Sequence, residues 1–309
     1  MFAAEQIPYN QTNAFSKIVR DYLLGSGQLQ PFYSEPPTIK GFEETIRKKQ
    51  SQKVDRALLV SVLEEQYKDV VASPMVKENI ELLLSQKSFT VCTAHQPNLF
   101  TGPLYFIYKI LHTIKLADHL KQQFSQYHFI PVYYMGSEDA DFAELNHTYV
   151  DGKKIEWKKQ QKGAVGRMVV DQTLGNLIDE LEGQLMTLPN GKEVLDLLRK
   201  CYTNGRNIQT ATFELVNELY GIYGLVVLIP DHASLKRQMQ SVFLDDLFHH
   251  TSSEIVHRTS QKLEEHYTVQ AHPREINLFY LEGDTRERII RKENYFIVHN
   301  TSIRFSDEE

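Results

Sequence analysis

The sequence predicts an α/β protein built on a parallel sheet. Three near-continuous apolar runs of strand length lie at residues 89–93, 129–135 and 225–229. Helical periodicity over residues 103–124 separates the first two runs, and the connections between these segments are short. A β-α-β order with short connections is typical of a parallel sheet. The length of 309 residues suggests about two domains.

The part of the chain before the first strand predicts an N-terminal helical segment, residues 1–88. Apolar side chains recur there at helical spacing, and Ser73-Pro74 has the form of a helix start, an N-cap followed by proline. The helices are expected at residues 13–24, 39–49 and 54–71 and from residue 73 onward.

The core is expected to be interrupted by insertions. Residues 89–150 form its first part, residues 151–221 a mainly helical connector, and residues 222–268 a core strand with helices. Residues 269–309 alternate as short strands and predict a β-rich connector. Within these segments we expect hairpin strands at 153–158 and 167–170, and helices at 174–188, 192–202, 210–220, 234–248 and 253–267.

The composition is that of a packed chain with an acidic balance. It is 41% hydrophobic and 24% charged, with a net charge of −6 and no basic face, so nucleic acid is not expected as a partner. Two cysteines without a CxxC pair exclude a disulfide framework, and Cys92, inside a strand, is expected to be buried and inert. The start of the chain lacks a signal-peptide pattern, and the most apolar helix, residues 103–120, contains charges. We therefore expect a cytoplasmic protein without a membrane span.

The first candidate site is the turn His95-Gln96-Pro97-Asn98, between the strand at 89–93 and the helix at 103–124. A polar turn before a helix N-terminus is a natural anion or nucleotide site, because free backbone N–H groups and the positive end of the helix dipole face the ligand. Thr101 is a candidate N-cap, and Gly102 permits close backbone approach. A structural turn that only caps the helix would explain the same residues.

The second candidate site is the acidic run Glu138-Asp139-Ala140-Asp141, which follows the strand at 129–135. Its carboxylates repel one another unless they bind a cation, an amine or a metal. Alternatively, Ser137 caps a helix whose first turn carries the acids. Because the carboxyl ends of parallel strands meet at one edge of the sheet, this run is expected beside the His95 turn.

Asn146-His147 and Asp231 are further polar positions in the same region. His147 is either an acid or base or a hydrogen-bonded structural histidine. Asp231, after the third strand, is either a binding carboxylate or an N-cap. Gly163-Ala164-Val165-Gly166 lacks the strand and helix context of a dinucleotide loop, and neither a Walker phosphate loop nor an HExxH motif occurs. We therefore expect no bound metal.

Two stretches of the chain have a close counterpart in a known family. Residues 95–105 read HQPNLFTGPLY and residues 131–142 read PVYYMGSEDADF, followed by Asn146-His147. These stretches resemble HQxxLxTGPLY, PVFWxAxEDHDF and a following NH pair in the bacillithiol biosynthesis cysteine-adding enzymes, and GLVVL at 224–228 resembles a later strand of that family. The family usually has His where this chain has Ala140, which we expect to be a lineage variant because both flanking acids remain.

The resemblance implies a Rossmann-like core related to class I aminoacyl-tRNA synthetases and nucleotidyltransferases, with the HQxN turn in the place of their HIGH motif. It implies a bacillithiol synthase, a ligase that forms the amide bond between cysteine and the glucosamine amine of glucosaminyl malate in the last step of bacillithiol biosynthesis. It further implies later core strands and a C-terminal coiled coil through which the full-length enzyme forms a homodimer. We expect the later core strands and the coiled coil to lie outside this chain, which would then be an N-terminal fragment of a longer enzyme.

The same resemblance assigns roles to the candidate residues. His95 and Asn98 would stabilise phosphate or carboxylate charge at the helix N-terminus, and His147 would accept a proton. The carboxylates of the acidic run would hold an ammonium group or position the attacking amine. The residues expected to be catalytic are His95, Asn98, Asp139 and His147, and those expected to bind substrate or nucleotide are Gln96, Thr101, Gly102, Glu138, Asp141, Asn146 and Asp231.

The implied partners are the small molecules cysteine and glucosaminyl malate. ATP or another nucleotide is left open as a cosubstrate, because no phosphate loop of standard type is present. Two alternatives remain: a nucleotidyltransferase that uses the His95 turn for ATP, and a non-catalytic small-molecule-binding fragment. Adenylate transfer that does not depend on cysteine would favour the first alternative.

Overall fold

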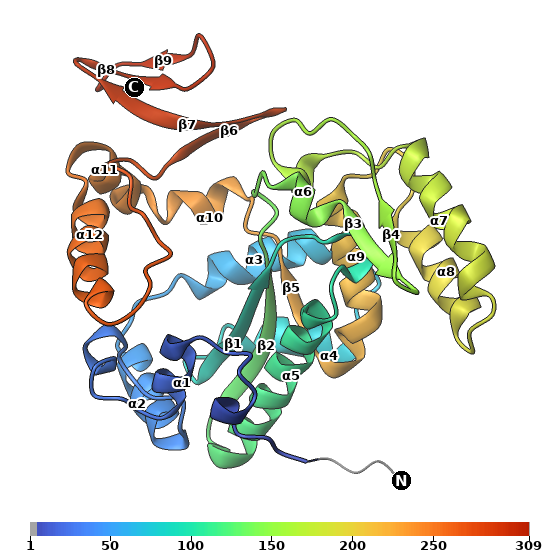
Figure 1. The fold of residues 1–309 in the computed structure, drawn as a ribbon, viewed down its shortest axis with the longest axis horizontal. Coiled ribbons are helices and arrows are strands. Elements are labelled where there is room, and N and C mark those ends of the chain that lie inside the picture. Colours follow the sequence, from blue (N-terminus) through green and yellow to red (C-terminus); the bar gives the residue numbers. More distant parts are fainter. Residues whose placement is uncertain (1–4, 309) are drawn as a thin grey trace. The chain divides into compact units, whose positions relative to one another are not determined.

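The computed structural model describes residues 5–308, which form two compact units (Figure 1). One unit joins the chain up to Lys53 to Val242–Leu278. The other joins Val54–Ser241 to the chain from Phe279 onward. All the candidate site residues belong to the second unit.

The first unit is helical. Its helices are α1 (Lys17–Leu23), α2 (Ile39–Gln50), α12 (Thr251–Glu264) and most of α11 (Gln240–Phe248), with 3-10 helices η1 (Tyr9–Gln11) and η2 (Gln30–Phe32). The Tyr267 hydroxyl donates a hydrogen bond to Asp21 Oδ2 over 2.9 Å, which ties the segment after α12 to α1. The helices expected at 13–24, 39–49 and 253–267 are confirmed with shifted ends.

A three-stranded parallel sheet forms the centre of the second unit (Figure 1). Its strands are β1 (Ser88–His95), β2 (His128–Met135) and β5 (Val226–Leu228), in the order β1-β2-β5. Helix α5 (Tyr105–Gln123) connects β1 to β2, so the predicted β-α-β unit is confirmed. The register pairs Ser88 with His128 and His95 with Met135, and β1 and β2 therefore end level at their carboxyl edge.

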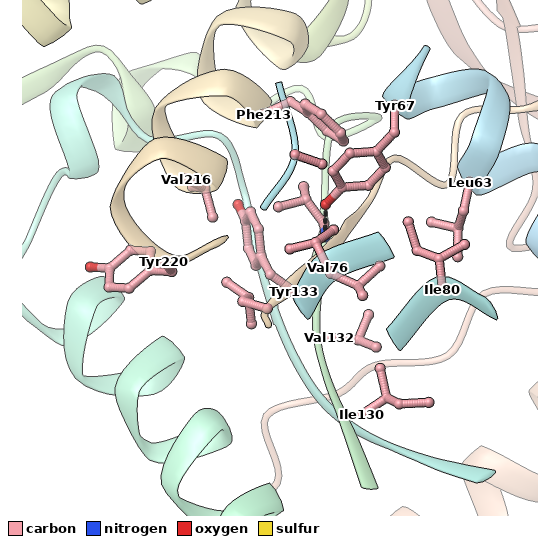
Figure 2. Packing of buried hydrophobic residues seen from close by; sticks show 14 of the residues in the cluster. Leu63, Tyr67, Val76, Ile80, Ile130, Val132, Tyr133, Phe213, Val216 and Tyr220 are labelled. Atoms are coloured by element: carbon pink, nitrogen blue, oxygen red, sulfur yellow. Dashed lines mark hydrogen bonds between the residues drawn. The ribbon is translucent and has the colours of Figure 1, made fainter. Parts of the chain in front are cut away.

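Helices bury the sheet through apolar side chains (Figure 2). The helices α3 (Arg56–Tyr67) and α4 (Pro74–Leu82) precede β1, and α4 begins as predicted, with Ser73 as N-cap and Pro74 in the first turn. The buried cluster joins these helices to α5, α9 and the strands, and it includes Leu63, Tyr67, Val76, Ile80, Phe106, Ile130, Val132 and Phe213.

Two side chains of α3 occupy the outer edge of β5. Val227 N–H donates to Tyr67 Oη over 2.8 Å (Figure 2). Gln66 Nε2 donates to the Ile229 carbonyl over 2.7 Å, and Gln66 Oε1 accepts from Ile229 N–H over 3.1 Å. Alternate residues of a strand direct their backbone groups to the same side. On the side away from β2, these backbone groups therefore bond to side chains rather than to a further strand.

The connector between β2 and β5 has a buried cluster of its own. The first half of the connector contains α6 (Phe142–Leu145), the antiparallel strands β3 (His147–Val150) and β4 (Lys153–Glu156), and the 3-10 turn η4 (Val165–Arg167). The second half contains the helices α7 (Gln172–Leu185), α8 (Gly191–Cys201) and α9 (Ile208–Tyr220), and the 3-10 helix η5 (Gly221–Tyr223). Trp157 is buried in this cluster, and its indole N–H donates over 3.1 Å to Asp171, the N-cap of α7. The three predicted connector helices and the strand expected at 153–158 are confirmed.

Two expectations about β1 and the connector are wrong. The residues predicted as a strand at 167–170 form the end of η4 and a single bridge between Val169 and Asn207, because the backbone here bonds to the loop that precedes α9. Cys92, expected to be buried, has an exposed side chain, because alternate residues of β1 are exposed.

The second unit ends in an antiparallel meander. Helix α10 (Ala233–Arg237) follows β5, and the later strands are β6 (Phe279–Glu282), β7 (Thr285–Lys292), β8 (Tyr295–Val298) and β9 (Arg304–Phe305), paired in that order. The short strands expected there are confirmed. The single helix expected at 234–248 is wrong, because Gln238 and Met239 donate to carbonyls three residues back and end α10 before α11 begins. Between residues 5 and 308, no helix combines the length and apolar character needed to cross a membrane.

Candidate active site at the carboxyl edge of the sheet

His95 is the last residue of β1 and is half-buried. Its Nδ1 lies 3.2 Å from the Gln96 carbonyl oxygen. Because a carbonyl can only accept a hydrogen bond, the neutral ring carries its proton on Nδ1. Burial lowers the pKa of His95, although the contact with Gln96 opposes this, and the nearby Lys109 lowers the pKa further. The ring is therefore neutral at pH 7.

The turn after His95 is conformationally strained. Phe100, Thr101 and Gly102 have φ values of 51°, 73° and 55° in succession. A left-handed backbone at a bulky or β-branched residue costs on the order of 1–3 kcal/mol and persists where the surrounding structure enforces it, typically at functional sites. Phe100 is enforced by burial and by a hydrogen bond of 3.3 Å from its N–H to Tyr202 Oη. The prediction of Thr101 as N-cap is wrong: Pro103 follows the strained turn, and Leu104 is the N-cap of α5.

Asn98 lies beneath this turn with 3% of its surface exposed. A Cβ added to Gly102 would lie 2.6 Å from Asn98 Cβ and 2.7 Å from its Nδ2, so only glycine fits there. Asn98 Oδ1 is buried and has no hydrogen-bond partner among residues 5–308. A buried amide oxygen left in this state is costly and is found chiefly where it serves a function.

One hydrogen bond joins the His95 turn to the acidic run. Gln96 Nε2 donates to Asp139 Oδ2 over 2.6 Å. The other carboxylate oxygen of Asp139 accepts from Ala140 N–H, also over 2.6 Å. The ends of β1 and β2 are thus connected through side chains that the sequence placed in separate motifs.

Glu138 and Asp231 belong to a partly buried ionic network with two cations. Arg167 donates to both carboxylate oxygens of Asp231, Nε to Oδ2 over 2.7 Å and Nη2 to Oδ1 over 2.9 Å. Lys236 Nζ donates to Asp231 Oδ1 over 2.8 Å and also pairs with Glu138. Burial favours a raised pKa for Asp231, whose side chain is 6% exposed, but the bonds from Arg167 and Lys236 outweigh burial and lower it. Asp231 is therefore ionised, and Arg167 and Lys236 balance its charge.

The alternative in which Ser137 or Asp231 caps a helix is wrong. Asp231 is not an N-cap, because α10 begins after His232. Ser137 does not cap a helix either: its Oγ is buried without a hydrogen-bond partner among residues 5–308. Asp141 is exposed and precedes α6 without a capping hydrogen bond from its side chain.

His147 begins β3 and is held by its neighbour. Its Nδ1 lies 3.1 Å from Asn146 Oδ1, while Asn146 Nδ2 donates to the Trp157 carbonyl over 3.3 Å. The amide orientation that satisfies both contacts makes Nδ1 the donating nitrogen of His147, and Nε2 is the ring nitrogen left to accept a proton.

A cavity of about 1010 Å³ lies between the first turn of α5, β3 and the connector helices. Thr101, Gly102 and His147 line its polar side together with Glu144 and Tyr105. Gln96, Glu138, Asp139 and Asp231 do not line it. The other wall is apolar and is formed by Leu181, Leu185, Val194, Leu197, Leu198, Leu215 and Leu219.

The candidate residues thus form two adjacent groups. The cavity group contains Thr101, Gly102 and His147, and the His95 ring lies next to it, 5.2 Å from the ring of Tyr105. The strand-end group contains the Gln96–Asp139 pair and the ionic network. Among residues 5–308, no cluster of His, Cys, Asp and Glu side chains has the composition of a metal site.

Several residues of this region carried no signal in the sequence. Arg167 and Lys236 belong to no motif of the sequence, and only the fold brings Arg167 to Asp231. Glu144 lies in the amphipathic turn of α6 and has no motif of its own. The one available signal was the pair of glycines at 163 and 166 next to Arg167, which has no dinucleotide-loop context.

Comparison with known proteins gives a consistent result. The model of the family described as "Bacillithiol biosynthesis BshC, N-terminal Rossmann-like domain" matches residues 2–309. Relatives from Flavobacterium johnsoniae, Flavobacterium psychrophilum and Cytophaga hutchinsonii, each named "Putative cysteine ligase BshC", are 41%, 40% and 38% identical to the chain. The matches cover 98%, 98% and 100% of this chain and 57% of each relative. The chain therefore spans little more than half the length of these relatives.

Proposed function

Because the chain belongs to the BshC family of bacillithiol biosynthesis, we propose that it supplies the active site of a ligase that joins the cysteine carboxyl group to the glucosamine amine of glucosaminyl malate. The names of the relatives support cysteine ligation. The amide bond, the second substrate and the place of this reaction as the last step of the pathway are the finer part of the proposal. The activity is proposed for the whole protein, since the relatives extend beyond the part matched here.

The observation that carries the proposal is the hydrogen bond between Gln96 and Asp139. It unites the two motif stretches at the carboxyl edge of a parallel sheet, which is where open α/β folds bind ligands. The strained turn from Phe100 to Gly102 and the unpartnered Asn98 oxygen lie at the same edge. Three features typical of functional sites therefore coincide at one place.

The residues divide the chemistry of amide formation between them. Amide formation needs an activated carboxyl group and a neutral amine. The C–N bond forms as the C–O bond to the activating group breaks, that group leaves with the oxygen, and the amine loses a proton. We assign the acceptance of that proton to His147, whose free Nε2 belongs to a ring that lines the cavity. We assign stabilisation of carboxylate or phosphate charge to His95 and Asn98, and the binding of substrate polar groups to Gln96, Thr101, Gly102 and Asn146.

The acidic residues are assigned by their existing partners. Glu138 and Asp231 already pair with Lys236, so we propose that they shape the edge rather than provide free carboxylates. Asp139, fixed by Gln96, and the exposed Asp141 are the carboxylates left to hold the amine of a substrate.

A thiol profile in cells tests the proposal. Deletion of this gene should remove the final thiol and cause glucosaminyl malate to accumulate, and the intact gene should reverse both changes. The gene with His95→Ala should fail to do so, whereas His119→Ala, at an exposed position far along α5, should succeed. An unchanged profile after deletion would refute the ligase, and normal thiol levels with His95→Ala would refute the assigned role of His95.

Adenylate transfer is the second candidate function, and one observation favours it. Leu104 and Tyr105, at the start of the 19-residue helix α5, line the cavity, so the positive end of the helix dipole faces it. Labelled ATP incubated with the purified protein distinguishes the two functions. Transfer of adenylate at the same rate with and without cysteine would favour this alternative over the ligase.

A further inference from the structure

The η4 turn lies along the acidic run and bonds to its backbone. Val165 N–H donates to the Asp139 carbonyl, and Gly166 N–H donates to the Ser137 carbonyl, each over 2.8 Å. Asp139 is therefore held from two directions, through its carboxylate by Gln96 and through its backbone by Val165. A turn from the connector thus sets the position of a residue at the end of β2.

Gly166 is required by the closeness of this contact. A Cβ added at position 166 would lie 2.5 Å from Ser137 Cβ and 2.6 Å from the Ser137 carbonyl oxygen. Atoms this close overlap strongly, and one of the partners is backbone, which cannot move aside without displacing the strand end. Any larger residue at position 166 would push η4 away from the acidic run.

Arg167 fixes the same turn to the end of β5. Its guanidinium makes two parallel hydrogen bonds to Asp231, the geometry in which a planar fork matches a carboxylate. Lysine has the charge but not the fork, so it would keep the attraction and lose the orientation. The η4 turn therefore connects the ends of β2 and β5 across the edge.

We propose that Gly166 and Arg167 are positioning residues that place Asp139 for the reaction; this inference rests on the proposed function. Neither residue lines the cavity: Gly166 acts through the backbone of Ser137, and Arg167 acts by fixing the η4 turn to Asp231. The alternative is that the contacts of Gly166 and Arg167 contribute to stability alone. The positioning role and the purely structural role differ in their effect on turnover, because a displaced Asp139 lowers the rate of the chemical step while the folded protein persists.

The kinetic test uses the intact protein and four variants. Arg167→Ala and Gly166→Ala should lower kcat about 10- to 100-fold and change the KM for cysteine less than about threefold, since misplacing a reacting group costs rate rather than binding. Arg167→Lys should recover part of the loss. The matched control is Arg199→Ala, which removes an exposed arginine that also bridges two acids, Asp179 and Glu182, and should leave kcat unchanged.

Hydrogen exchange tests the same inference without any assay of activity. Ala140 N–H bonds to the Asp139 carboxylate, so its exchange rate reports the position of Asp139. Arg167→Ala should speed exchange at Val165, Gly166 and Ala140, and Arg199→Ala should not. Unchanged exchange at these amides, or faster exchange with a wild-type kcat, would overturn the inference. Wild-type protein without cysteine ligation but with the expected exchange pattern would refute the proposed function and leave the positioning geometry established.

Discussion

Replacing Tyr67 with Phe should cost about 1–3 kcal/mol of stability, the penalty for one buried N–H without an acceptor. Tyr67 is 7% exposed, and its oxygen is the acceptor for Val227 N–H at 2.8 Å. Val227 is 0% exposed, so no water replaces that oxygen. Phenylalanine keeps the ring and its contact with Phe213, whose ring centre lies 4.7 Å away. The loss should therefore stay below the roughly 3–5 kcal/mol of removing an aromatic ring altogether.

Urea unfolding followed by far-ultraviolet circular dichroism measures this difference. The matched control is Tyr108→Phe, which removes the hydroxyl of a residue that is 64% exposed and should change stability by less than about 0.5 kcal/mol. Hydrogen exchange at Val227 should quicken in Tyr67→Phe, because the broken bond is local. If both variants unfold at the same urea concentration, the argument that Tyr67 satisfies the edge of β5 is refuted.

Three further predictions concern the site and its surroundings. Gly102→Ala should destabilise the protein by about 1–3 kcal/mol more than Gly152→Ala in the same urea assay, because both glycines have positive φ but only Gly102 is crowded by Asn98. Asp171 accepts bonds from Thr173, Lys159 and Trp157 that outweigh burial and lower its pKa from 3.8 to about 2. The stabilising effect of the ionised carboxylate is thus complete above pH 3.8 and is lost as the pH falls toward 2. At neutral pH the free energy of unfolding of the wild type should exceed that of Asp171→Asn by on the order of 1 kcal/mol after allowance for solvent screening. This difference should disappear over the same acid range. Finally, the titration of the His95 ring followed by nuclear magnetic resonance should have its midpoint below pH 6.5, the ordinary value for histidine, because burial lowers the pKa of His95; a midpoint above that value would contradict the environment described for His95.

The sequence was sufficient for the features that depend on local pattern. The apolar runs of β1, β2 and β5 and the helical periodicity of α5 fixed the parallel sheet, because buried strands and amphipathic helices differ in period. The polar turn at His95 followed from its place at a strand end. Ser73-Pro74 was recognised for the same reason, since capping depends on adjacent residues.

Features that depend on contacts between distant segments could not be predicted. Arg167 and Asp231 are separated by 64 positions and meet only because the connector folds back over the sheet edge. Thr101 was misassigned because a left-handed turn at Phe100 and Thr101 has no sequence signature when the residues are not glycine. The apolar wall of the cavity arises from α7, α8 and α9, and apolar side chains that line a cavity look in sequence like any others of a helix.

The two borders of the parallel sheet differ in their exposure to other chains. At the border at β5, Tyr67 bonds to Val227 N–H and Gln66 bonds to both backbone groups of Ile229, so these groups cannot pair with an approaching strand. Over residues 5–308, β1 is the outermost strand at the opposite border, and it bears the exposed side chains of Thr90 and Cys92. An outermost strand of eight residues is a template for edge-to-edge association. Arg56 and Lys109 bond to the carbonyls of Ser88 and Ala94 near the two ends of β1, so aggregates of this 309-residue chain should grow from the middle of β1 more readily than from β5.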